Sequence, residues 1–102
     1  MRVILIILIL LPMYVRAADI NCRGLVVVAM DYPQKCSGGM AFKTASSNGS
    51  WICPPSKNGN SIVLTALTAG KEVSVYIDSQ GDTITCSALP QYTPARYVII
   101  YP

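Results

Sequence analysis

The segment SKNGNSIVLTALTAGKEVSVYID, residues 56–78, decides the fold because its hydrophobic period changes in the middle. In its first half apolar residues recur at helical spacing, with Thr65 and Thr68 on the opposite side. Its second half alternates apolar and polar residues, which is typical of a strand with one solvent-exposed face. The apolar positions of the two halves are Ile62, Val63, Ala66, Leu67 and Ala69, then Val73, Val75 and Ile77. The segment predicts a helix that leads directly into a strand.

The predicted helix has recognisable start and stop signals. Pro54 and Pro55 end the strand before it. Asn60 or Ser61 is expected to cap its N-terminus, and Gly70 is placed to end it in the left-handed conformation. A helix of about ten residues is marginal alone, so its apolar face is expected to pack on a sheet.

Three strands are predicted before this helix. Leu25 to Met30 is apolar without alternation, which predicts a central strand buried on both faces. Met40 to Ala45 alternates, with Lys43 facing outward. Asn48-Gly49 supplies positive φ at both turn positions, so Trp51 to Cys53 is expected to fold back as a hairpin. The same pair begins an N-glycosylation sequon, for which a turn is the favoured interpretation.

With the strand that ends the segment 56–78, the chain has two or three predicted strands after the helix. Ser79 to Asp82 is a predicted turn, Thr83 to Ala88 a predicted strand with Ile84 and Cys86 on one side, and Tyr97 to Tyr101 a last apolar strand. The sequence therefore predicts a mainly β fold with one short helix. An OB-like curled sheet or barrel of five to six strands, with the helix between strands three and four, fits this order.

Residues 1–17, MRVILIILILLPMYVRA, have the composition of a secretory signal peptide. The apolar run from Val3 to Leu11 is far shorter than the roughly 18 to 20 residues that span a bilayer, so an uncleaved anchor is the less favoured alternative. Val15 and Ala17 form a small-residue cleavage pattern. Residues 18–102 are expected to form a single domain, secreted or periplasmic, with no membrane span after processing.

Processing also changes the charge of the chain. With Arg2 and Arg16 removed, six of the eight basic residues remain against five acidic ones, a net charge of about +1. This near-neutral value argues against binding to nucleic acid or to an anionic membrane surface. A domain of this size has a small core, so covalent cross-links are expected.

The four cysteines predict two disulfides, because an even number in a short exported chain is typical of a disulfide framework. Of three possible pairings we favour Cys22 with Cys86 and Cys36 with Cys53. Closure of a barrel would bring the first pair together, and the second would fasten the loop after the first strand to the end of the hairpin. The chain has no histidine and no CxxC spacing, so neither a metal site nor a cofactor is expected.

Several features together resemble a toxin family: the early Cys22, the run IVLTALTAGKEVSVYID, Cys86 followed by Ser-Ala-Leu-Pro, and the ending RYVII. Over most of Cys22 to Tyr101 the chain resembles small secreted bacterial proteins related to the B subunits of subtilase cytotoxin and pertussis-like AB5 toxins. This resemblance implies an OB-type barrel that assembles into a pentameric homo-oligomer. It also implies binding of host glycans and delivery of an enzymatic A subunit.

Four residues are candidates for ligand binding: Trp51, Asn58, Tyr76 and Tyr92. Trp51 follows the hairpin turn, where its ring could stack on a sugar with Asn58 nearby; the alternative is that it packs in the barrel. Tyr76 falls on the exposed face of its strand, and Tyr92 in the loop PQYTPAR. Both tyrosines could bind a ligand, line a subunit contact or pack as ordinary surface residues.

Catalysis is not indicated, because without histidine the usual general base is absent and the five carboxylates form no recognisable dyad. No catalytic residue is therefore predicted. The favoured function is a secreted binding module for a glycan or glycoprotein. The alternatives are a secreted or periplasmic inhibitor that binds a partner protein, and a small exported enzyme.

Overall fold

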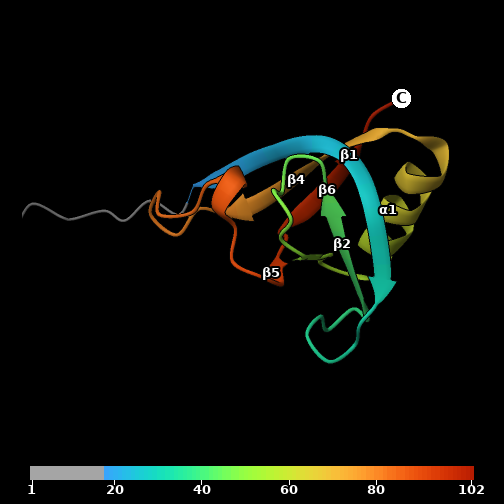
Figure 1. Ribbon diagram of the computed structural model, residues 1–102, viewed down its shortest axis with the longest axis horizontal. Helices are drawn as coiled ribbons and strands as arrows, with labels where there is room; N and C mark the ends of the chain where they lie inside the picture. The colour runs from blue at the N-terminus through green and yellow to red at the C-terminus, as the bar shows by residue number, and fades with distance from the viewer. Residues whose placement is uncertain (1–17) are drawn as a thin grey trace, which may run out of the picture.

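The computed structural model describes residues 18–102 and shows one curled sheet of six strands with a single α-helix beside it (Figure 1). The elements are β1 Asp19–Asp31, β2 Met40–Thr44, β3 Ile52–Cys53, α1 Lys57–Ala69, β4 Glu72–Asp78, β5 Thr93–Pro94 and β6 Tyr97–Ile100. The fold is mainly β, and the helix lies between the third and fourth strands. The predicted OB-like fold class is confirmed.

The sheet curls because one segment forms both of its edges. The strand order is β5-β3-β2-β1-β4-β6, and only Ala95 and Arg96 separate the two edge strands. The Ala95 amide donates to the Cys53 carbonyl at 2.9 Å, and the Arg96 amide donates to the Tyr76 carbonyl at 2.7 Å. The two ends of the sheet are thereby drawn together around a common core, as in an OB-like arrangement.

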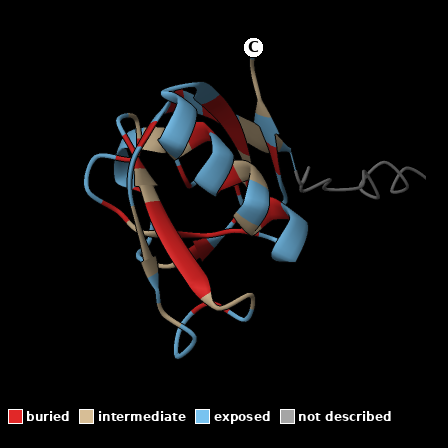
Figure 2. Ribbon diagram, turned by 90° about the vertical axis from the view of Figure 1, so that its right-hand side faces the viewer, coloured by how far each residue is buried: buried red, intermediate tan, exposed pale blue. Residues whose placement is uncertain are grey.

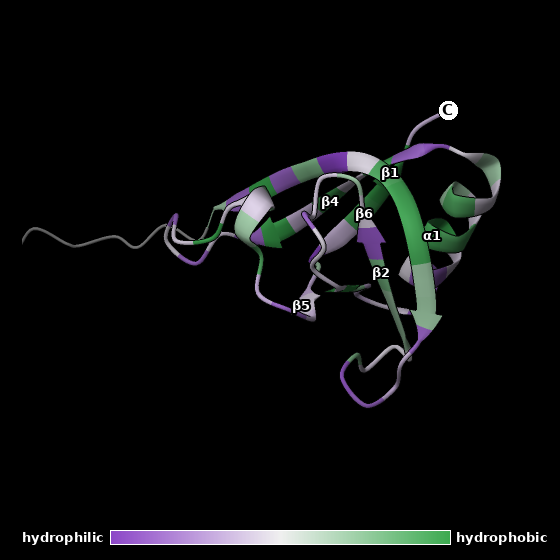
Figure 3. Cartoon of the chain, in the orientation of Figure 1, coloured by the Kyte–Doolittle hydropathy of each residue, from purple (hydrophilic) through white to green (hydrophobic). Residues whose placement is uncertain are grey.

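The long strand β1 is central, as predicted, but it is not buried on both faces. Its first half pairs with β4 and its second half with β2, and the register shifts between Val26 and Val28. Leu25 is 45% exposed and Val27 55% exposed. Figure 3 shows that the hydropathy of β1 changes from alternating to continuously apolar along its length. The prediction failed because, within residues 18–102, no second layer of structure covers the outer face of this apolar stretch.

The predicted hairpin between β2 and β3 is confirmed. Asn48 has φ 52° and Gly49 has φ 83°, so both occupy the left-handed region that the tight turn requires. Phe42 of β2 pairs with Ile52 of β3. The Asn48 side-chain amide donates to the Ser87 carbonyl at 2.9 Å, which ties the turn to the segment before β5.

The helix begins earlier than predicted. Ser56 caps it, with its hydroxyl accepting from the Gly59 amide at 3.2 Å, so neither Asn60 nor Ser61 is the cap. Asn60 instead lies in the first turns and donates from its side chain to the Gly38 carbonyl at 2.9 Å. Gly70 ends the helix with φ 67°, as predicted.

The apolar face of α1 packs against β1 and β6, which closes one end of the core (Figure 2). Val63 and Ala66 are buried, whereas Thr65 and Thr68 are exposed, as the periodicity predicts. Ala69, predicted on the buried face, is exposed in the last turn. The largest fully buried core side chains in the described region are Phe42, Ile52, Val63, Val73, Val75 and Ile77.

The predicted strand Thr83–Ala88 is wrong. The Thr83 and Ile84 amides both donate to the Ser79 carbonyl, at 3.0 and 3.1 Å, and Cys86–Ala88 forms a short 3₁₀ helix. These local bonds take the amide groups that a strand would have used for pairing. Ile84 is nevertheless buried. The pattern therefore indicated correctly that this side chain faces the core, but it indicated the wrong backbone conformation.

Both predicted disulfides are present, joining Cys22 to Cys86 and Cys36 to Cys53 with Cα–Cα distances of 5.5 and 5.2 Å. They connect segments 64 and 17 residues apart. Within residues 18–102 no helix is long and apolar enough to cross a membrane. The predicted signal peptide, residues 1–17, lies outside the described residues.

Candidate functional site

The parallel pairing of β3 and β5 brings two of the predicted binding residues side by side. Ile52 pairs with Thr93, so Trp51 and Tyr92, the residues directly before the two strands, are neighbours. The Tyr92 amide donates to the Trp51 carbonyl at 2.8 Å. The Trp51 amide in turn donates to the Gln91 side-chain oxygen at 3.0 Å. The main-chain bond fixes the spacing between the two aromatic residues, and the bond to the Gln91 side chain holds Trp51 against the same loop.

A small second core supports this pair. It consists of Cys36, Ala41 and Cys53, separate from the main core, and partly buried aromatic side chains pack against it. Besides Trp51 and Tyr92 these include Tyr32, which directly follows β1. The Tyr32 and Tyr92 ring centroids are 5.3 Å apart and their planes are tilted by 33°. We call Tyr32, Trp51 and Tyr92 the aromatic site.

Lys43 adds a cation to the aromatic site. Its Nζ lies 4.5 Å from the centroid of the Trp51 ring, which is a cation–π distance. Trp51 is therefore neither a fully buried core residue nor a freely exposed one: its ring packs on the second core and Lys43 lies over it. A sugar ring can stack on the indole only where the flexible Lys43 side chain now lies, so binding there requires Lys43 to move aside, and its amine can then bond to a sugar hydroxyl.

Tyr92 has an unusual backbone. Its φ is 60°, in the left-handed region that costs a residue with a bulky side chain about 1 to 2 kcal/mol in general. Such conformations persist where the surrounding structure holds them, and they cluster at functional sites. Desolvation and the adjacent Tyr32 raise the pKa of Tyr92 above its ordinary 10.0.

The other two predicted binding residues lie elsewhere. Tyr76 is on β4 in the other half of the sheet, where it stacks on Tyr97 with ring centroids 4.5 Å apart. Asn58 is exposed in the first turn of α1. Neither is part of the second core that holds the aromatic site. Their roles in binding stay predictions, and they would belong to surfaces other than this one.

The sequence analysis missed Tyr32 and Lys43. A signal for Tyr32 was available, because the predicted bond between Cys36 and Cys53 places the loop that begins at Tyr32 beside the end of the hairpin. Lys43 was placed on the outward side of its strand, but its proximity to Trp51 depends on how the hairpin is paired. The contacts of Tyr32 with Tyr92 and of Lys43 with Trp51 both depend on how the strands pair, which the sequence pattern of a single segment does not show.

The fold and the aromatic site define a small, disulfide-bonded, OB-like β domain. No protein-family model matches the chain, and neither a curated protein nor a solved structure matches it.

Proposed function

We propose that this chain is a secreted binding module that recognises a glycan or glycoprotein through the aromatic site. The observation that carries the proposal is the parallel pairing of β3 and β5, which places Trp51 beside Tyr92 over the Cys36–Cys53 disulfide. A cross-linked backbone presents these rings with little conformational freedom left to lose on binding, which favours recognition. Lys43 and the Tyr32 and Tyr92 hydroxyls supply polar groups at its margin.

Secretion is part of this proposal. Two disulfides within an 11.0 kDa chain suit an oxidising compartment. The leader sequence supplies a route of export. We expect cleavage after Ala17, and the intact mass of the exported protein checks this directly. A mass that still includes Met1 to Ala17 would contradict both the cleavage and the secreted state.

The proposal is tested by screening the oxidised protein on a glycan array together with variants of the site. Trp51→Ala and Tyr32→Ala should each weaken the strongest signal about 5- to 100-fold if the rings are hot spots. Ile99→Ala is the control, because Ile99 is a 39% exposed apolar residue on β6, outside the aromatic site. It should bind like the wild type.

The same experiment separates the competing functions. If no glycan or glycoprotein binds, or if Trp51→Ala binds like the wild type, the glycan-binding function is wrong at this site. A stoichiometric partner protein that co-purifies with the secreted chain would then favour the inhibitor or partner-binding alternative.

A further inference from the structure

The second half of β1 has an unpaired edge. Residues 26–31 pair with β2 on one side, whereas β4 pairs only with residues 19–25. On the side away from β2, no strand within residues 18–102 continues the sheet beyond Leu25. The free edge runs beside α1, and nothing in the proposed function involves it.

The hydrogen-bond pattern identifies which residues offer their main-chain groups at this edge. The Tyr32 amide donates to the Gly39 carbonyl, on the β2 side. Because the direction of main-chain groups alternates along an antiparallel strand, Met30 and Val28 also face β2. Ala29 and Asp31 therefore direct both N–H and C=O away from β2. In the described part of the chain neither has a main-chain partner on that side.

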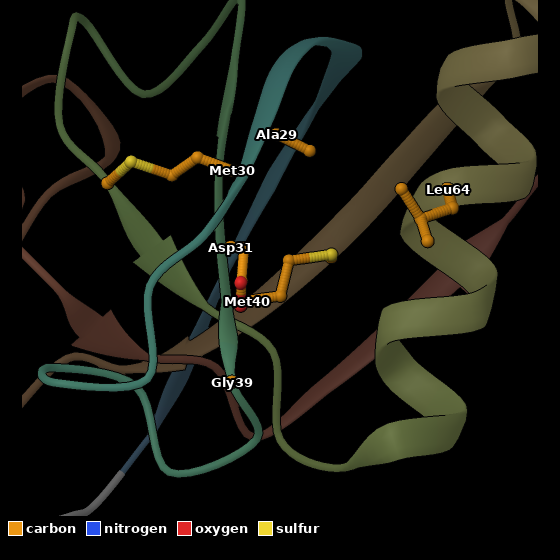
Figure 4. A pocket seen from close by; sticks show the side chains of 6 residues that line it. All are labelled: Ala29, Met30, Asp31, Gly39, Met40 and Leu64. Atoms are coloured by element: carbon orange, nitrogen blue, oxygen red, sulfur yellow. The ribbon is translucent and has the colours of Figure 1, made fainter.

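A groove lies at these two residues. It has a volume of about 310 Å³ and is lined by Ala29, Met30, Asp31, Gly39, Met40 and Leu64. Figure 4 shows Leu64 of α1 and Met40 of β2 directed toward each other across it, while Met30 points the opposite way. Leu64 is 47% exposed, so the far wall of the groove is an accessible apolar side chain.

Asp31 gives the groove a charge. It is exposed, and no Lys or Arg of residues 18–102 forms an ion pair with it. A strand that carries a basic residue would supply the missing partner. A second copy of β1 would bring another Asp31 and no cation in its free-edge residues 27–31, so it lacks this complementarity.

We propose that the free edge of β1 binds an extended peptide segment of a partner protein, which adds to the sheet as a further strand. Its main chain bonds to Ala29 and Asp31. Because Asp31 pairs with Met40 and lies on the same face of the sheet, one face of the peptide carries both an apolar side chain that contacts Leu64 and Met40 and, two residues away, a Lys or Arg beside the Asp31 carboxylate. This is a protein-binding activity on a surface other than the aromatic site. It requires no change in the backbone of the domain, since the strand that accepts the peptide is already formed.

The test uses isotope-labelled protein and three capped synthetic peptides: Ac-SKTVTVS-NH2, whose Lys and valines share one face of a strand, the same peptide with Glu for Lys, and a version with proline after the Lys. Without peptide, the Ala29 and Asp31 amides should exchange with solvent much faster than that of Met30. With the Lys peptide at about ten times its Kd, exchange at Ala29 and Asp31 should slow about tenfold. The proline peptide, which cannot pair along its length, should give no such slowing.

Two substitutions make the test specific. Asp31→Lys should reverse the preference from the Lys to the Glu peptide, a change of about two- to fivefold in each Kd. Leu64→Asp should weaken the Lys peptide about fivefold or more, because the apolar wall is lost. Thr65→Asp is its control, since Thr65 is exposed on the same helix but does not line the groove.

Three results would overturn the proposal. One is unchanged exchange at Ala29 and Asp31 at every peptide concentration, and another is equal affinity for the Lys and Glu peptides. The third is slow exchange without peptide that depends on protein concentration, together with a dimer in sedimentation. That result would show that a second copy of the chain covers the edge.

Discussion

At the scale of single residues, Tyr92 connects the fold to the proposed function. Its left-handed backbone is unfavourable for a tyrosine, yet in this conformation its amide donates a hydrogen bond to the Trp51 carbonyl and its ring lies beside that of Tyr32. A residue chosen for stability alone at this position would be glycine or asparagine, which adopt positive φ more easily. A need for its ring in binding would explain a tyrosine at this position.

Comparing the variants Tyr92→Gly and Tyr92→Ala separates the cost of backbone strain at Tyr92 from the contribution of its ring packing. Both variants lose the ring, but only glycine relieves the positive φ, so Tyr92→Gly should unfold about 4 °C or more above Tyr92→Ala. Thermal unfolding of the oxidised variants measures this, and both should bind more weakly than wild type. Equal melting temperatures would indicate that the backbone at Tyr92 is not strained.

At the scale of elements, the start of helix α1 is set by the Ser56 side chain, which is not part of the hydrophobic pattern. Ser56 follows Pro54 and Pro55 and satisfies the Gly59 amide, while the apolar face begins only at Ile62. The first turn of α1 is polar, so hydrophobic periodicity alone placed its start too late. Its cap therefore contributes to stability independently of core packing.

Ser56→Ala should lower the free energy of unfolding by about 1 kcal/mol, because the first turn loses its capping acceptor. Ser61→Ala is the matched control, since Ser61 is exposed within the helix and alanine is the better helix former. Chemical denaturation of the two oxidised variants gives the comparison. If Ser61→Ala were the more damaging change, Ser56 would not be the cap.

Local patterns were sufficient for some elements and insufficient for others. The alternation of Val73, Val75 and Ile77 predicted β4 because a strand with one buried face carries its own period. The region Thr83–Ala88 was mispredicted because its amides bond to the preceding turn. The outer face of Leu25–Met30 was mispredicted because burial depends on whether another layer is present, which no local pattern records.

The candidate site was predictable only in part, for a similar reason. Trp51 and Tyr92 were identified as binding residues from their types and loop positions. That they are neighbours follows from the parallel pairing of β3 and β5, which joins segments about forty residues apart in sequence. The grouping of Tyr32 with them, and the separation of Tyr76 from them, depend on strand order in the same way.

At the scale of the whole molecule, the two disulfides have different roles. Cys22–Cys86 ties β1 to the 3₁₀ helix after β4, and Cys22 packs in the main core. Cys36–Cys53 forms most of the second core, against which the aromatic site packs. The first bond therefore supports the domain as a whole, and the second supports the site in particular.

Replacing each pair of cysteines by alanine should reveal this division. Loss of Cys22–Cys86 should cost about 4 kcal/mol of unfolding free energy and loss of Cys36–Cys53 about 3, since the first closes the longer loop. Measured at a temperature where both variants are folded, ligand affinity should fall more in the variant lacking Cys36–Cys53. Equal affinities in the two variants would contradict the role given to the second core.

The most direct test of the aromatic site uses the fact that Trp51 is the only tryptophan of the chain. The oxidised protein is titrated with the strongest array glycan while the Trp51 indole N–H resonance and fluorescence are followed. We expect both signals to change and to saturate at the Kd measured by calorimetry, with Tyr32 and Tyr92 ring signals shifting along with them. A glycan that binds while all three rings remain unperturbed would show that the ligand binds elsewhere, and would contradict the site proposed for this protein.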